Sequence, residues 1–215
     1  MKMTRDEQVS ATREALLAAA ERLYAERGVH AVGNRQISEA AGQGNNAAVS
    51  YHFGTKADLI RAIARKHAGQ IERIRERMMA DIADSTDLRD WVACLVRPFT
   101  EHLETLGSPT WYARFTAQVM ADPAFSAIMV EEALTAAPML RLFQDGLARR
   151  LSDMPAEIHL ERASMTRHLV VQMCVERERA LAEHGPTFRP TWDATANGLI
   201  EAIVAMWQAP VLHPS

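Results

Sequence analysis

The stretch AVGNRQISEAAGQGNNAAVSYHFGTK, residues Ala31 to Lys56, decides the fold of this chain. It predicts two short helices separated by a turn that contains glycine. Ile37 lies on an apolar face of the first helix, and Gly42 can take the left-handed conformation that ends a helix. The second helix is predicted over Asn46 to His52. Two helices joined in this way form a helix-turn-helix, whose second member is shaped to lie in a DNA major groove.

The second helix of the motif is expected to have a buried face and an open face. Ala48 and Val49 can point inward, while Asn46, Ser50 and Tyr51 remain on the outside. For Tyr51 an alternative is packing beneath the helix. The exposed face is therefore the candidate recognition surface.

Helices are also predicted on both sides of the motif. Ser10 or Thr12 caps a helix that runs to about Arg27, and the residues before it are expected to fray. Thr55, followed three residues later by Asp58, forms a capping box. It starts a helix that extends to about residue 84, and that helix would span roughly 40 Å. Such a helix is long enough to belong to two domains.

Four segments occur in a characteristic order. They are LYAERG (Leu23 to Gly28), NRQISEAAG (Asn34 to Gly42), SYHFG (Ser50 to Gly54) and TKADL (Thr55 to Leu59). Together they resemble the DNA-binding domain of the TetR-type one-component transcriptional regulators, over about the first 70 residues. The resemblance implies an all-α fold of about nine helices, with a helix-turn-helix DNA-binding domain at residues 9–69 and a ligand-binding and dimerisation domain at residues 70–215.

The same resemblance implies which residues bind DNA. Arg35 and, in the second helix, Asn46, Ala47 and Ser50 match positions in the major groove, where Arg can pair with guanine and Asn with adenine. Tyr51, His52 and Lys56 match family positions that mainly hold the sugar-phosphate backbone. The full predicted set is Asn34, Arg35, Asn45, Asn46, Ala47, Ser50, Tyr51, His52 and Lys56.

Two features of the motif depart from the family pattern. The turn from Gly42 to Asn46 is one residue longer than usual, and Ser50 stands where an aromatic residue is commoner. His52 has an alternative role as a helix cap, and Asn34 can serve as the N-cap of the first helix of the motif.

The last two predicted helices, at about 156–183 and 192–208, carry broad apolar faces. Two such antiparallel helices suit a two-fold four-helix interface. We therefore expect them to hold a homodimer together. The alternative is that they cover the core of their own chain. Trp207 lies in the second apolar stripe, and Trp207→Glu is therefore expected to dissociate the dimer.

In the family a small molecule enters the C-terminal domain, and the long fourth helix transmits its presence to the DNA-binding domain. The resemblance thus implies a homodimeric, ligand-responsive regulator, by default a repressor, that binds a palindromic operator. Its effector is expected to be largely apolar. The candidate lining residues, each of which could instead fill the core, are Trp91, Phe99, His102, Trp111, Tyr112, Phe115, Met129 and Phe143.

The composition agrees with this interpretation. The chain has 215 residues and a net charge of −3, but residues 1–69 hold ten Lys and Arg against seven Asp and Glu. The positive balance is therefore at the end that would face DNA. The absence of a long apolar run and of a secretion leader favours a cytoplasmic protein. Cys94 and Cys174 are expected to be buried thiols, a redox switch being the alternative.

Two other classes of protein are alternatives to a DNA-binding regulator. The sequence has no P-loop, HExxH or G-x-S-x-G motif, so we expect no enzyme activity and no cofactor. His159 and His168 are expected to be helix-surface residues instead of metal ligands. The remaining alternative is an all-helical small-molecule-binding or scaffold protein with a non-functional DNA-binding motif. Such a protein would form no specific DNA complex, whereas a DNA reader loses affinity steeply as salt rises.

Overall fold

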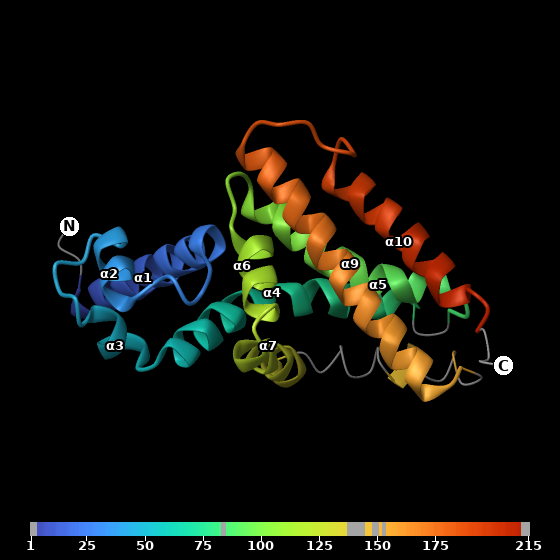
Figure 1. Ribbon diagram of the computed structural model, residues 1–215, viewed down its shortest axis with the longest axis horizontal. Helices are drawn as coiled ribbons and strands as arrows, with labels where there is room; N and C mark the ends of the chain where they lie inside the picture. Colours follow the sequence, from blue (N-terminus) through green and yellow to red (C-terminus); the bar gives the residue numbers. More distant parts are fainter. Residues whose placement is uncertain (1–3, 83–84, 137–144, 148–150, 152–153, 212–215) are drawn as a thin grey trace. The chain divides into compact units, whose positions relative to one another are not determined.

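The computed structural model describes residues 4–82, 85–136, 145–147, 151 and 154–211, apart from the side chains at 133, 134 and 136. Across this described part every regular element longer than one turn is an α-helix, so the predicted all-α class is confirmed (Figure 1). The helices are α1 (Arg5–Arg27), α2 (Asn34–Ala40), α3 (Ala48–Phe53), α4 (Lys56–Ile82), α5 (Leu88–Leu106), α6 (Tyr112–Met120), α7 (Pro123–Ala136), α9 (Ala156–Ala182) and α10 (Trp192–Gln208).

Helix α1 begins earlier than the sequence predicted. Thr4 is its N-cap: the Thr4 hydroxyl accepts from the Glu7 amide at 3.3 Å, and the Glu7 carboxylate accepts from the Thr4 amide at 2.7 Å. The start predicted at Ser10 or Thr12 was wrong. The first two turns are mostly polar and exposed, so they lack the apolar spacing on which that prediction rested, while the capping box supplies partners for two end amides.

The described chain divides into two compact units. Unit 1 consists of Met1–His67 and Trp111–Ala133, and unit 2 of Ala68–Thr110 and Leu134–Ser215. In unit 1, α1 packs against α2 and α6, and α2 packs against α3. Side chains from all of these helices and from the first part of α4 are fully buried, among them Leu16, Tyr24, Ile37, Val49, Ile60, Ile63 and Phe115. The helix-turn-helix therefore rests on a core to which α6 also contributes.

An ion-pair cluster joins α7 to the first part of α4 within unit 1. The Glu132 side chain is buried, and its carboxylate accepts from Arg65 Nε at 2.6 Å and Arg65 Nη2 at 3.0 Å. A second guanidinium also approaches this carboxylate: Arg61 Nε lies 3.2 Å from Glu132 Oε1. Two guanidinium groups thus compensate the buried carboxylate, as a charge removed from water requires.

In unit 2, α10 packs along α5, and α9 and α10 run antiparallel to each other, as predicted (Figure 1). The apolar stripe of α10, however, is buried within the chain itself. Trp192, Leu199, Ile203 and Trp207 are all less than a tenth exposed. The stripe is core, so Trp207→Glu does not isolate a dimer contact. An interface through α9 and α10 stays a prediction and would use other faces of these helices.

Among the described residues, no helix combines the length and the apolar character that crossing a membrane requires.

Candidate nucleic-acid interface

The turn of the helix-turn-helix is built on Gly42, as the sequence predicted. Gly42 has φ +69°, a conformation that side chains other than glycine rarely adopt. Its amide donates to the Glu39 carbonyl at 3.0 Å, and the Gln43 amide donates to the Ser38 carbonyl at 2.9 Å. These two bonds form a Schellman motif, which satisfies the last carbonyls of α2 and reverses the chain toward α3.

Helix α3 begins at Ala48, two residues later than predicted. The Asn45 side chain accepts from the Ala47 amide at 2.9 Å, which holds the preceding residues in a turn instead of a helix. Asn46 and Ala47 therefore lie in the turn that leads into α3. Ala48 and Val49 are buried, as expected.

The outer face of the turn and of α3 is open. Tyr51 is 82% exposed, so the alternative that it packs beneath the helix is wrong. Its ring meets the His52 ring edge-on, with centroids 5.1 Å apart. The other exposed residues of this face are Asn45, Asn46, Ala47 and Ser50. An aromatic ring and several amide and hydroxyl groups are thus presented together on one short element.

Two residues at the start of α2 lie beside this face. Gly33 is the N-cap position of α2, so the N-cap role predicted for Asn34 was wrong; instead the Asn34 Nδ2 donates to the Ser50 hydroxyl at 3.0 Å. Arg35 is exposed, and its Nε donates to Glu39 Oε1 at 2.7 Å. Sequence reasoning missed Glu39, although its spacing of four residues from Arg35 on a helix was visible. The hydrogen bond and charge of Glu39 raise the pKa of Arg35, which stays a full cation.

His52 and Lys56 have partners inside the unit. The His52 carbonyl accepts from Arg13 Nη1 at 3.0 Å. Lys56 Nζ donates to the carbonyls of Val29 at 2.8 Å and Val32 at 2.9 Å, in the loop between α1 and α2. Two of the three Lys56 donors are therefore occupied by backbone. The phosphate contact predicted for Lys56 stays a prediction, and the structure shows that this side chain also ties α4 to that loop.

Lys56→Met is expected to lower the free energy of unfolding by about 1 to 3 kcal/mol, because both carbonyls lose a charged donor. Urea denaturation of the wild type and the variant measures the difference. The matched control is Lys66→Met, since Lys66 pairs with Glu14 at 3.1 Å on the surface. Such a pair contributes at most about 1 kcal/mol. Equal losses of unfolding free energy in the two variants would show that the Lys56 bonds to this loop do not stabilise the fold.

The capping box at the start of α4 is confirmed. The Asp58 amide donates to the Thr55 hydroxyl at 3.1 Å, and Asp58 Oδ2 accepts from the Thr55 amide at 3.2 Å and from the Thr55 hydroxyl at 2.6 Å. These bonds from Thr55 lower the pKa of Asp58, and Arg61 at 2.8 Å acts in the same direction. The capping box therefore satisfies end amides at the start of α4.

The predicted effector-binding residues fall in different parts of the chain. Trp91, Phe99 and His102 belong to unit 2, Trp111, Tyr112, Phe115 and Met129 belong to unit 1, and Phe143 lies outside the described residues. Tyr112 stacks on His67 with ring centroids 3.7 Å apart and on Phe115 at 6.2 Å. These two aromatic residues therefore serve the core of unit 1, as the alternative for the set foresaw. A ligand-binding role for the set stays a prediction.

Comparison with known proteins bears on the whole arrangement. Residues 16–63 match the family model described as bacterial regulatory proteins, tetR family. Among curated proteins, none matches the chain significantly. A TetR-family transcriptional regulator from Mesorhizobium loti aligns over 94% of this chain and 98% of its own, with 17% identity and a TM-score of 0.50. PfmR, a TetR-family transcriptional regulator from Thermus thermophilus, aligns over 99% of this chain and 100% of its own, with 15% identity and a TM-score of 0.52.

These likenesses to solved structures show the fold, and the match at residues 16–63 covers α2, α3 and the turn between them. Residues 16–63 therefore match the TetR family of bacterial regulatory proteins, and the described helices have a fold like that of solved TetR-family regulators.

Proposed function

We propose that the chain is a homodimeric, ligand-responsive transcriptional repressor that binds a palindromic DNA operator through α2 and α3. In this proposal residues 9–69 form the DNA-binding domain, and residues 70–215 form the ligand-binding and dimerisation domain. The observation that carries the proposal is the open face of α3, where Tyr51 is 82% exposed. A large aromatic side chain left in water on a short helix, among amides and hydroxyls, is typical of a binding surface.

The residues of this face divide into two roles. Arg35, Asn46 and Ser50 carry donors and acceptors that can bond to base edges in the major groove, each good pair being worth about 1 to 3 kcal/mol of discrimination. Asn45 and Ala47 flank them in the turn, and Asn34 bonds to Ser50. Tyr51, His52 and the remaining donor of Lys56 are assigned to the sugar-phosphate backbone, where contacts fix the register of the protein on the duplex.

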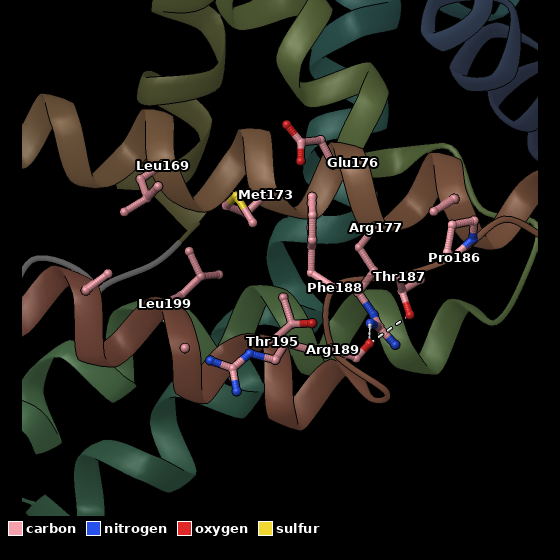
Figure 2. A pocket seen from close by; sticks show the side chains of 13 residues that line it. Leu169, Met173, Glu176, Arg177, Pro186, Thr187, Phe188, Arg189, Thr195 and Leu199 are labelled. Carbon is pink, nitrogen blue, oxygen red and sulfur yellow. Dashed lines mark hydrogen bonds between the residues drawn. The ribbon is translucent and has the colours of Figure 1, made fainter.

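One helix-turn-helix contacts few base pairs, so a dimer that reads two half-sites is the expected solution. A groove of about 280 Å³ between α9 and α10 supports an interface there. Figure 2 shows Leu169 and Met173 of α9 facing Leu199 of α10 across it. Phe188, which lines the groove from the loop between α9 and α10, is 83% exposed, and Met165 on α9 is 47% exposed. Apolar side chains in water on α9 and on the loop that follows it favour burial against a second copy.

Release from DNA would require an effector that binds the second domain. Helix α4 runs from Lys56 in unit 1 to Ile82 in unit 2, so it provides a continuous backbone connection between them. To convert a population from mostly bound to mostly free, the effector must favour the released state by about 5 kcal/mol. The effector proposed here is a largely apolar small molecule, in keeping with the aromatic residues of the predicted set.

The proposal is tested by selecting binding sequences from a pool of random DNA duplexes with the purified full chain. We expect a palindromic consensus whose half-site centres are about 10 base pairs, or 34 to 36 Å, apart or a multiple of that distance. The affinity for the selected duplex should fall steeply as salt rises. A pool that shows no enrichment would favour the alternative of a small-molecule-binding or scaffold protein with a non-functional motif.

A further inference from the structure

Arg13 of α1 makes two contacts with the C-terminal end of α3. Its Nη1 donates to the His52 carbonyl at 3.0 Å, and its guanidinium carbon lies 4.3 Å from the centroid of the Phe53 ring. Phe53 is buried, so the guanidinium is held between the core and the last turn of the helix. A cation over an aromatic face at this distance is an attractive contact.

This end of α3 needs such a partner. The helix has six residues, and its last carbonyls have no amide donor within the helix. The Ser50 carbonyl accepts from the Gly54 amide at 3.0 Å, and Gly54 turns the chain away with φ +78°. The His52 carbonyl is left for Arg13. The positive charge of Arg13 also lies at the negative end of the helix dipole, which favours it there.

The N-terminal half of α3 is held from a different helix. Asn34 of α2 donates to the Ser50 hydroxyl at 3.0 Å, one turn of helix or less from the bond made by Arg13. Tyr51 lies between the two held residues and is free of the core. Arg13 is itself fixed, because Leu16 and Leu17 follow it on α1 and are buried. The Arg13 side chain therefore links the orientation of α3 to that of α1.

We infer that Arg13 is a positioning residue for DNA recognition, which orients the reading helix from behind without contacting DNA. The inference rests on the proposed function. It goes beyond the exposed face, since it assigns operator specificity to a part-buried residue on another helix. Without Arg13, α3 would lose the hydrogen bond that joins it to α1. It would then be held mainly by the packing of Ala48 and Val49, and its orientation would vary more. Base-edge bonds tolerate such movement less than phosphate contacts do, because they require a fixed geometry.

The test uses the full chain, the selected operator duplex and an unrelated duplex of equal length. For Arg13→Met we expect affinity for the operator to fall about tenfold, the value of one charged hydrogen bond, with less than about twofold change for the unrelated duplex. The slope of log affinity against log salt should be unchanged, because no phosphate contact is removed. Arg13→Lys keeps the charge and a donor, so its operator affinity should lie between those of the wild type and Arg13→Met. It replaces Arg13→Met in the test if that variant does not fold. The matched control is Arg22→Met on the same helix, whose guanidinium lies 4.0 Å from Glu26.

A slope that falls by about one would overturn the inference, because Arg13 would then be a phosphate contact. Equal losses for both duplexes would also overturn it, since they indicate a general loss of folded protein. Hydrogen exchange without DNA provides an independent reading: amides 50–54 should exchange faster in Arg13→Met and not in Arg22→Met. If exchange behaves in this way but the wild type selects no DNA, the proposed function fails while the contact of Arg13 with α3 stands.

Discussion

Tyr51→Glu is expected to lower operator affinity at least about 100-fold while leaving thermal stability unchanged. The Tyr51 side chain is 82% exposed, so its replacement removes no core contact. In the proposed complex the new carboxylate would lie beside phosphates, where like charges cost several kcal/mol, and the aromatic contact to the backbone would also be lost. Fluorescence anisotropy with the selected duplex, at one salt concentration, measures the affinity.

The control for the added charge is Gln118→Glu, on an exposed residue of α6 in the same unit. It should change affinity less than about threefold, as a single distant charge is screened. Tyr51→Phe separates the hydroxyl from the ring and should cost about tenfold or less. If Tyr51→Glu bound the operator as tightly as the wild type, α3 would not be part of the DNA interface, and the proposed function would be wrong.

Trp207→Glu is expected to unfold unit 2. Trp207 is 3% exposed, its indole Nε1 donates to the Thr166 hydroxyl at 2.8 Å, and its carbonyl accepts from Arg162 Nη1 at 2.8 Å. Loss of a buried Trp costs about 3 to 5 kcal/mol, and a buried carboxylate without a partner adds to this. The sum is comparable to the whole stability of a typical domain, about 5 to 15 kcal/mol. Circular dichroism and thermal denaturation should show loss of helix.

The matched variant for this substitution is Met165→Glu, which places the same charge on α9 at a residue that is 47% exposed. It should fold normally, with a change in stability within about 1 kcal/mol. Sedimentation velocity of this variant then tests the proposed dimer, which should dissociate. A folded, dimeric Trp207→Glu protein would contradict the burial of Trp207 in the core.

The helix-turn-helix could be predicted from sequence because its signals are local. At the end of α2 the Gly42 amide bonds to Glu39 and the next amide, of Gln43, bonds to Ser38, while Thr55 starts α4 through Asp58. The start of α10 at Trp192 follows in the same way from Thr191, whose hydroxyl accepts from the Ala194 amide at 3.0 Å. Each of these features depends on residues that a reader of the sequence sees together.

What could not be predicted depends on distant partners or on competition between local bonds. Lys56 bonds to carbonyls 24 and 27 residues away, and Arg13 bonds to a carbonyl 39 residues away. The late start of α3 reflects a side-chain bond at Asn45 that competes with helix. For α10, periodicity identifies an apolar stripe but not what covers it, so a core and a dimer interface look alike.

The division of unit 1 into two segments has a consequence for synthesis. Translation delivers the reading helices first, yet Phe115 and Val119 of α6, both fully buried in that unit, follow only after Ala68–Thr110 has been made. The nascent N-terminal end therefore cannot complete its packing until the ribosome has passed residue 133. A prematurely terminated product that stops after α4 would lack that packing.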